Sequence, residues 1–377
     1  MYARLPTPFT KSSFLFGPRG TGKSAWVRDV FPGALVFDLL DAGVYAELAA
    51  DPTRLGERIP KGHKSFVVLD EVQKAPALLD EVHRLIETRK LRFVLTGSSA
   101  RKLRRGGANL LAGRAHTNRM HPLTAVELGP DFRLSHSLKY GHLPMAYTQS
   151  RPAEYLRAYA GTYLREEVLQ EGFTRNLGAF ARFLEQASLG QGQLLNTAAL
   201  ARDAAVTQKT AEGYIDLLED LLLSVRLPSF TKRAKRRVVQ HPKFYIFDAG
   251  VFRAIRPKGP LDTPEEEAGA ALETLAMQEL RAHNDYGNCG YTMHHYRTSA
   301  GHEVDFVLYG ERGIRAFEVK RAAKVRAADL KGLQVFLADY PMAKATLVYG
   351  GSERRYEGEI ELVPAEEWFR ELPAFLE

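Results

Sequence analysis

The sequence is poor in cysteine and lacks long apolar runs. Its one cysteine, Cys289, excludes an internal disulfide and predicts a reducing compartment. No apolar stretch approaches the roughly 20 residues that a membrane-spanning helix needs. The N-terminus lacks the basic-then-apolar pattern of a secretion signal, and neither repeats nor low-complexity tracts occur. We therefore expect a cytoplasmic protein without membrane contact.

The chain is long, and it carries an excess of positive charge. Its 377 residues are 45% hydrophobic, which predicts two or three domains with cores of their own. The formal net charge is +7 at pH 7. This balance favours an anionic partner without identifying it.

A glycine-rich stretch near the N-terminus predicts a phosphate-binding loop. It follows the apolar run Ser13-Phe14-Leu15-Phe16 and precedes a segment suited to a helix, which is the order such a loop requires. Glycines let backbone N–H groups turn toward one anion, while a lysine adds charge and a hydroxyl can bind Mg²⁺. The residues assigned to ATP are Gly17, Gly20, Thr21, Gly22, Lys23 and Ser24. The alternative is a plain glycine-rich turn.

Further apolar runs follow at the spacing of an α/β fold: 34–40, 66–69 and 92–95. The second ends in Asp70-Glu71, where Asp70 could hold Mg²⁺ and Glu71 could polarise the attacking water. Read alone, the pair could be an ordinary acidic strand end. The third run leads to Ser98, which could orient that water. Because this strand follows the Asp-Glu strand, the order predicts the additional-strand class of ATPases.

Several segments together resemble a known family, the prokaryotic AAA-superfamily ATPases with a C-terminal PD-(D/E)XK-like domain of poorly defined function. They are the phosphate loop, Val68–Gln73, Leu95–Ser99, Leu111–Arg114 and Pro122–Leu128. The resemblance implies that Arg114 is an arginine finger or sensor, with Arg101 a weaker rival. If Arg114 acts on a neighbouring copy, the protein is a homo-oligomer. The stretch 101–119 has no acidic residue, so a solvated or DNA-facing basic loop is the alternative.

The middle of the chain is predicted to be helical and then to form a helix-turn-helix. Apolar residues spaced three and four apart indicate helices between Pro152 and Leu189. Two short helices capped near Asn196 and Thr207 follow, and the resemblance supports a winged helix here. Such a module reads bases or simply contacts protein.

A basic run comes next, at 231–243. It carries six cations and no carboxylate: Lys232, Arg233, Lys235, Arg236, Arg237 and Lys243. We expect contact with the phosphates of DNA, and the alternative is a charged, solvated sheet edge.

The last part of the chain predicts two strands joined by a short turn. Alternation in 301–308 and 315–320 would bring Asp305 and Glu318 together, with Lys320 beside them. Two carboxylates can bind Mg²⁺, and a lysine can stabilise charge on a phosphate. With Glu273 from the preceding helix as a further ligand, the pattern resembles the PD-(D/E)XK nuclease core. Charged hairpins are also common on solvated sheets, and this fold has silent members.

We therefore predict an α/β P-loop ATPase with a parallel sheet, then a helical and winged-helix region, then a C-terminal α/β PD-(D/E)XK-like domain. The predicted boundaries are 1–128 for the ATPase domain, 129–190 for a helical connector, 191–256 for the winged helix with its basic hairpin, and 265–377 for the nuclease-like domain. One hypothesis is a Mg²⁺-dependent ATPase that acts on DNA with a metal-dependent nuclease domain. The other is an ATP-binding switch whose terminal fold is catalytically silent.

Overall fold

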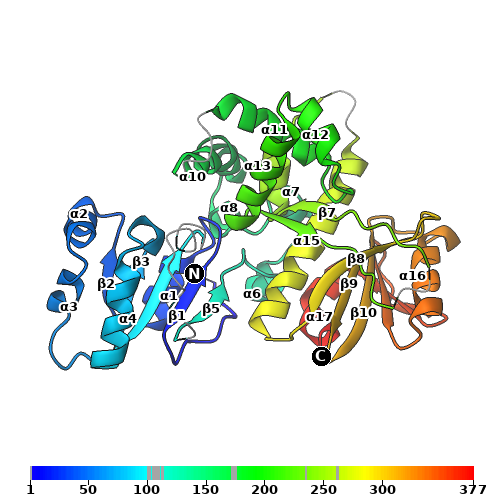
Figure 1. Cartoon of the computed structure of the whole chain (residues 1–377). Helices are drawn as coiled ribbons and strands as arrows, with labels where there is room; N and C mark the ends of the chain where they lie inside the picture. Colours follow the sequence, from blue (N-terminus) through cyan, green and yellow to red (C-terminus); the bar gives the residue numbers. More distant parts are fainter. Residues whose placement is uncertain are drawn as a thin grey trace. The chain divides into compact units, whose positions relative to one another are not determined.

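The computed structural model describes residues 2–99, 103, 111, 114–170, 176–233, 236–259 and 263–377. Arg101 and Lys235, which the sequence analysis considered, lie outside these ranges. The chain folds as two units. The N-terminal unit is Arg4–His121 with Asp220–Leu222, and the C-terminal unit is Pro122–Glu219 and Leu223–Glu377 with the first residues of the chain. Figure 1 labels their elements.

The N-terminal unit is built on a five-stranded parallel sheet with the order β2-β3-β4-β1-β5. Strand β4 therefore lies between β1 and β3, which is the arrangement that the chain order predicted. The strands are β1 (Ser13–Phe16), β2 (Leu35–Asp38), β3 (Phe66–Asp70), β4 (Arg92–Gly97) and β5 (His116–Arg119). The helical segments are α1 (Lys23–Val30), α2 (Ala42–Ala50), α3 (Arg54–Arg58), the short 3₁₀ turn η1 (Val72–Lys74) and α4 (Leu78–Arg89).

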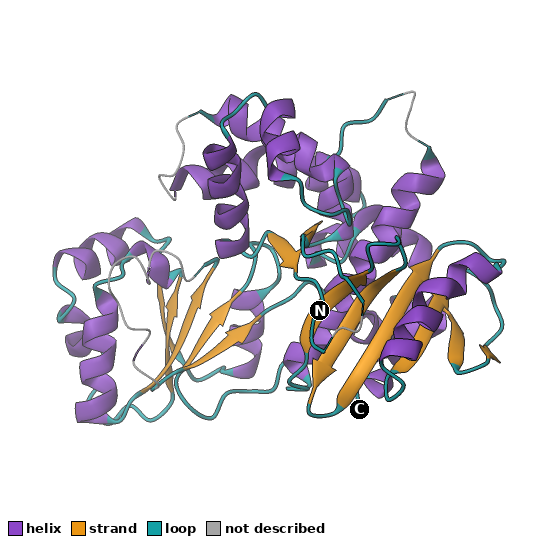
Figure 2. Cartoon of the chain, turned by 45° about the vertical axis from the view of Figure 1, so that its right-hand side comes forward, coloured by secondary structure: helices purple, strands orange, loops and turns teal. Residues whose placement is uncertain are grey.

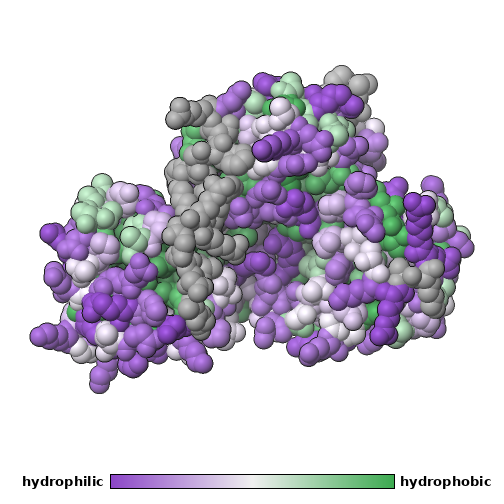
Figure 3. Space-filling view, in the orientation of Figure 1, coloured by the Kyte–Doolittle hydropathy of each residue, from purple (hydrophilic) through white to green (hydrophobic). Residues whose placement is uncertain are grey.

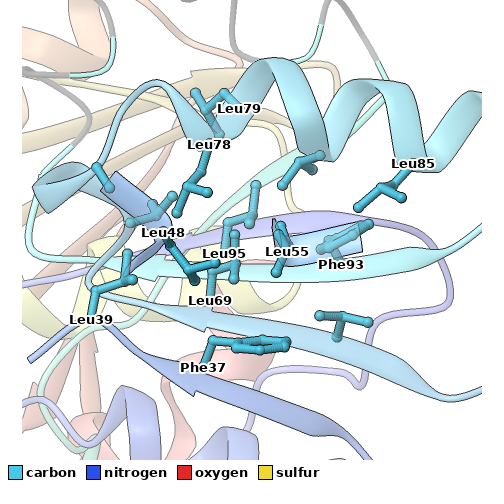
Figure 4. Packing of buried hydrophobic residues seen from close by; sticks show 14 of the residues in the cluster. Phe37, Leu39, Leu48, Leu55, Leu69, Leu78, Leu79, Leu85, Phe93 and Leu95 are labelled. Atoms are coloured by element: carbon cyan, nitrogen blue, oxygen red, sulfur yellow. The ribbon is translucent and has the colours of Figure 1, made fainter. Parts of the chain in front are cut away.

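Both faces of the sheet are buried at its three central strands, β1, β3 and β4, which explains why these strands appear in the sequence as continuous apolar runs. Phe14 and Phe16 point into a large core shared with α4, whereas Leu15 between them packs on Trp26 of α1. Figure 4 shows Leu78, Leu79 and Leu85 of α4 packed over the strands. The parallel arrangement places the carboxyl ends of all five strands at one edge, which becomes the candidate site.

Helix α2 contributes little to that core. Leu48 is its one buried residue, and Figure 3 shows apolar side chains at the surface over this helix. Val36 and Leu40, which flank the end of β2, are also exposed. A small apolar patch therefore lies at the surface near α2 and the end of β2.

The C-terminal unit begins with a helical layer. Its helical elements are α6 (Ala125–Leu128), η3 (Gly129–Asp131), α7 (Leu134–Tyr140), α8 (Pro144–Thr148), α9 (Pro152–Ala158), the π-helical turn η4 (Tyr159–Tyr163), α10 (Leu164–Gln170), α11 (Leu177–Leu189), α12 (Thr197–Asp203), α13 (Gln208–Asp220), α14 (Ala249–Ile255) and α15 (Pro264–Tyr286). Asn196 and Thr207 cap α12 and α13, as their side chains predicted: each accepts a hydrogen bond from a first-turn N–H group. The strands β6 (Ser224–Leu227) and β7 (Lys243–Ile246) pair antiparallel after α13.

A six-stranded mixed sheet completes this unit, with the order β12-β13-β11-β10-β9-β8 (Figure 2). Its elements are β8 (Thr292–Arg297), β9 (Glu303–Gly310), β10 (Gly313–Lys320), α16 (Ala327–Asp339), β11 (Lys344–Tyr349), β12 (Arg355–Glu357), β13 (Ile360–Pro364) and α17 (Ala365–Phe375). The predicted hairpin forms: β9 and β10 pair antiparallel with Phe306 opposite Phe317. Helix α16 approaches β9 so closely that a Cβ on Gly332 would lie 1.8 Å from the carbonyl oxygen of Glu303.

Two buried acids connect neighbouring elements of the helical layer by hydrogen bonds. Asp248 accepts hydrogen bonds from the N–H groups of Gly250 and Val251, capping α14, and from the N–H group of His142 at 2.8 Å. Glu279 of α15 accepts one from the N–H group of Ala125 at 2.7 Å. These acids therefore have structural partners on neighbouring elements, which accounts for their burial.

Candidate functional site

The phosphate loop has the geometry expected from its sequence. The Lys23 ammonium donates to the carbonyl oxygens of Gly17 at 2.7 Å and Pro18 at 3.2 Å, so its positive charge lies inside the loop. Gly20 and Gly22 have φ angles of 84° and 90°, which disfavour residues with a Cβ. A Cβ on Gly17 would lie 2.3 Å from the Met120 carbonyl oxygen.

The start of α1 is suited to an anion. Gly22 is its N-cap and has no side chain to occupy the first-turn N–H groups. Thr21 is buried within the loop, where its hydroxyl donates to Pro18 O at 2.9 Å. Ser24 stands in the first turn of the helix. The loop thus presents N–H groups and one ammonium, which fit the phosphates of ATP.

Acidic and polar residues face the same sheet edge from β3 and β4. Asp70 ends β3 and accepts a hydrogen bond from the Thr96 hydroxyl of β4. Glu71 follows in the left-handed region, with φ 60°, which turns its side chain off the strand direction. Ser98 is buried just beyond β4. The three predicted residues Asp70, Glu71 and Ser98 therefore lie on adjacent strand ends.

Sequence reasoning missed the residue that connects two of them. The Gln73 amide nitrogen donates both to a Glu71 carboxylate oxygen and, at 3.1 Å, to Ser98 Oγ. Gly97 provides room for this amide, because a Cβ there would lie 2.4 Å from Gln73 Oε1. The sequence feature that could have identified it is its position two residues after Glu71, within the segment Val68–Gln73 on which the family resemblance rests.

The residues of this edge also fit Mg²⁺ bound together with ATP. Mg²⁺ is usually held by one or two protein oxygens and by substrate phosphates, and Ser24 and Asp70 supply a hydroxyl and a carboxylate. When bound, the ion would neutralise charge on the phosphate oxygens. Lys23 would then hold the phosphates, and Glu71 would accept a proton from the attacking water.

Arg114 lies at the opposite end of the strands, where their amino ends are. It precedes β5, whose first residue His116 pairs with Ser13 at the start of β1. Its guanidinium pairs with Glu87, near the end of α4, and this pairing lowers the pKa of the Glu87 carboxyl. The phosphate loop follows the opposite end of β1. Within one chain, Arg114 is therefore separated from the phosphate loop by the length of a strand.

In the C-terminal unit the hairpin brings Asp305, Glu318 and Lys320 together. The N–H group of Asp305 donates to Glu318 Oε2 at 3.2 Å, and that of Val319 donates to Asp305 Oδ2 at 3.0 Å. The Lys320 ammonium lies 2.5 Å from Glu318 Oε1. The two carboxylates and the lysine therefore converge as alternation predicted.

A second ammonium, from Lys243 of β7, lies among these acids. Its Nζ is 3.0 Å from Glu273 Oε1, 2.6 Å from Glu303 Oε1 and 3.0 Å from Asp305 Oδ1. Lys243 was counted among the residues expected to contact DNA, but its side chain is only 3% exposed. We call Lys243, Glu273, Glu303, Asp305 and Glu318 the carboxylate centre.

Burial and charge shift the titration of this centre in opposite directions. Burial and the Asp305 carboxylate raise the pKa of Glu273, and the same two causes raise the pKa of Glu318 to about 8. Although burial opposes it, Lys243 and then Lys320 hold the pKa of Asp305 below its usual value. Burial alone would lower the pKa of Lys243, yet its acidic neighbours raise it well above the ordinary value. The acids around Lys243 therefore favour its charged form.

The predicted metal role of Glu273, Asp305 and Glu318 remains a prediction. In the part of the chain that the structure describes, no group of three His, Cys, Asp or Glu residues is arranged to hold a metal ion. As folded, the carboxylates of Glu273, Glu303 and Asp305 converge on the ammonium of Lys243. These residues do not fit a metal ion while that ammonium is in place.

The exposed part of the basic run is smaller than the sequence indicated. Arg236 pairs with the buried Asp339 at 3.0 Å, and Lys232 lies 4.0 Å from the Tyr309 ring centre. Arg233 and Arg237 are exposed. All four of these cations are exposed, but Arg236 and Lys232 already have partners, so contact with DNA through this run would rest mainly on Arg233 and Arg237.

No helix among the described residues is both long enough and apolar enough to cross a membrane.

Three family models match consecutive parts of the chain. An AAA domain matches residues 10–129. Two domains of unknown function, DUF8612 and DUF4143, match residues 133–262 and 268–368. Lys243 and the acids around it thus come from different matched regions.

Similar proteins cover most of the chain. Uncharacterized proteins of Mycobacterium tuberculosis and Mycobacterium bovis are each 28% identical over 354 residues, covering 90% of this chain and 76% of theirs. An uncharacterized protein of Haemophilus influenzae is 24% identical over 223 residues, covering 54% and 56%.

Among solved structures, the Orc1 protein of Aeropyrum pernix in complex with DNA is similar over 65% of this chain and 86% of its own, at 16% identity and a TM-score of 0.26. A TM-score this low supports no inference about this chain. The family match over residues 10–129 and the phosphate-loop geometry together support an AAA-type P-loop ATPase domain in the N-terminal unit.

Proposed function

We propose that this protein is a Mg²⁺-dependent ATPase that works as a nucleotide-driven switch on DNA, with a nuclease-like but catalytically silent C-terminal fold. The observation that carries the ATPase proposal is the placement of Lys23 and Glu71. One side chain is held inside the phosphate loop by Gly17 O and Pro18 O, and the other is tethered by Gln73 at the adjacent strand end. Phosphate binding and water activation need groups in these two places.

The experiment is ATP binding and turnover in three variants of the full chain. Lys23→Ala should abolish nucleotide binding, because it removes the ammonium inside the loop. Glu71→Gln should still bind ATP while turnover falls by about 100-fold or more, since it removes the proton acceptor. Glu57→Gln, on the exposed surface of α3, is the matched control. Unchanged turnover in Glu71→Gln would remove Glu71 from catalysis.

Arg114 supports an oligomeric form of this proposal. Arg114 lies at the amino ends of the strands, whereas its own phosphate loop lies at their carboxyl ends. It could therefore reach a γ-phosphate only in a neighbouring copy. Mixing Arg114→Ala chains with Glu71→Gln chains should restore part of the turnover if each supplies what the other lacks. Turnover that equals the sum of the two separate variants would argue against a shared site.

The proposed action on DNA rests on the middle region. Helices α12 and α13 are joined by a tight turn in which Ala205 has φ 55°, and the paired strands β6 and β7 follow. Gln208, Lys209 and Glu212 are exposed on α13. This order supports a winged helix, a module that binds DNA or protein.

Cleavage of DNA by the C-terminal fold is the second candidate. The convergence of Asp305, Glu318 and Lys320 favours it. The Lys243 ammonium at the same carboxylates favours the silent form, because a nuclease of this kind needs its acids for a metal ion. We therefore propose ATP hydrolysis, and not DNA cleavage, as the enzymatic activity of the folded chain.

A further inference from the structure

We infer that Lys243 is a built-in cation that takes the place of a divalent metal ion in the carboxylate centre and keeps the folded protein from binding metal there. The inference concerns the C-terminal unit and does not rest on ATP hydrolysis. It starts from three distances: the ammonium lies 2.6 to 3.0 Å from oxygens of Glu303, Glu273 and Asp305.

These three contacts use all the hydrogen-bond donors of the lysine ammonium. An ammonium group has three N–H donors, and three carboxylates surround it at ordinary hydrogen-bond lengths. A Mg²⁺ ion would need oxygens at about 2.0–2.1 Å in octahedral geometry. It could take this position only if the ammonium moved out.

The charge of the centre explains why a cation is needed there. Glu273, Glu303, Asp305 and Glu318 would repel one another if they were brought together without compensation. Lys320 contacts Glu318, and Arg297 lies 3.2 Å from Glu303. Lys243 forms the ion pairs that join Glu273 to the strand acids Glu303 and Asp305.

The backbone that carries Lys243 is held from several directions, which fixes the point from which its side chain reaches the acids. Lys243 pairs with Leu227 of β6 on one side and forms a bridge with Leu194 on the other. The Gly192 N–H group donates to Phe244 O at 2.8 Å. Tyr245, two residues along the strand, donates its hydroxyl to Glu273 Oε1 at 2.5 Å.

The loop before α12, which contains Gln191 and Gly192, packs against the Glu273 carboxylate. Gly192 has φ 71°, and a Cβ there would lie 3.2 Å from both Glu273 carboxylate oxygens. Gln191 anchors the loop, because its amide donates to the Thr274 hydroxyl at 2.8 Å and accepts from the Ile246 N–H group at 2.9 Å. The same loop therefore touches the strand that carries the cation and the helix that carries the acid.

The inference predicts that removing the ammonium creates a metal site. The nucleotide-free chain is titrated with Mn²⁺. Binding is followed by calorimetry and by the electron paramagnetic resonance signal of Mn²⁺. The wild type should show no site that depends on Asp305. Lys243→Met should gain one site, at least about tenfold tighter than any wild-type binding, because three acids then lack the cation that they share. Asp305→Asn added to Lys243→Met should abolish this site.

Two further variants keep the result interpretable. Lys331→Met, at an exposed position of α16, removes the same charge elsewhere and should gain nothing. If Lys243→Met does not fold, Lys243→Met combined with Glu303→Gln restores part of the charge balance and keeps three acids. ATP turnover should be unchanged in the folded variants, because Lys243 is not among the residues assigned to ATP.

Two results would overturn the inference. One is a wild-type Mn²⁺ site that Asp305→Asn abolishes, which can be measured whether or not the Lys243 variants fold. The other is a folded Lys243 variant that binds no more Mn²⁺ than the wild type. Loss of ATP turnover in Glu71→Gln bears only on the proposed ATPase and leaves this test unaffected.

Discussion

The side-chain amide of Gln73 donates to Ser98 Oγ at 3.1 Å across the carboxyl ends of β3 and β4. The same nitrogen donates to Glu71, so one amide holds the proposed base against the neighbouring strand. An acid held in this way has its direction set before substrate arrives, which lowers the cost of aligning it with a water molecule.

Replacing Gln73 by Ala should therefore lower kcat by about 10- to 100-fold, since small misplacements of a catalytic group have effects of this size. KM for ATP should change by less than about threefold, because Gln73 does not contact the phosphate loop. Gln73→Met fills the same space without donating hydrogen bonds and should be as slow as Gln73→Ala. Full activity of the Met variant would mean that Gln73 acts through packing alone.

Arg237 and Arg236 should behave differently when each is replaced by Ser. Arg237 is exposed, so its loss should weaken DNA binding and reduce the salt slope by about one. Arg236 compensates the buried Asp339, so its loss should lower the free energy of unfolding. Binding to a short duplex at several salt concentrations, with urea unfolding of both variants, tests the distinction. Equal salt slopes in Arg237→Ser and the wild type would mark the run as a solvated edge.

Glu279 should make the C-terminal unit sensitive to acid. Burial opposes ionisation, but the imidazoles of His142 and His283, 3.2 Å and 3.3 Å from its oxygens, lower the pKa of this carboxyl. A carboxyl with a lowered pKa in the folded state contributes stability above its unfolded pKa, and that contribution is lost as pH falls through the folded pKa. Glu279→Gln should cost about 1–3 kcal/mol at pH 7, and the difference should shrink below about pH 4.

Urea unfolding at pH 7, 5 and 3 measures this effect. Glu265→Gln, exposed in the first turn of the same helix, provides the control and should change little. A difference between Glu279→Gln and the wild type that is independent of pH would show that the carboxylate charge contributes nothing.

Gly332 and Gly269 should respond oppositely to substitution by Ala. A Cβ at 332 would lie 1.8 Å from Glu303 O, so α16 must move off β9, at a cost of about 1–3 kcal/mol or more. A Cβ at 269 in α15 would meet nothing within 4 Å, and the better helix former should gain about 0.5–1 kcal/mol. Thermal unfolding of both variants tests the pair. Equal stabilities would contradict the close approach of α16 to β9.

Much of the nucleotide site could be predicted from the sequence, because its determinants are local. A glycine loop between a buried strand and a helix start is contiguous in the chain, and so is an acid pair at the end of an apolar run. The β9–β10 hairpin was predictable for the same reason: a short turn and alternation of side chains place Asp305 near Glu318.

The tertiary structure alone decided which distant residues complete these sites. Gln73 reaches Ser98 only because β3 and β4 are neighbours in the sheet. Lys243 ends a basic run and so resembles a solvent-facing or DNA-facing residue in the sequence. The fold instead brings it to Asp305, 62 positions further along the chain. A cation's role depends on the charges that surround it and on its exposure to water, and neither is encoded in its immediate neighbours.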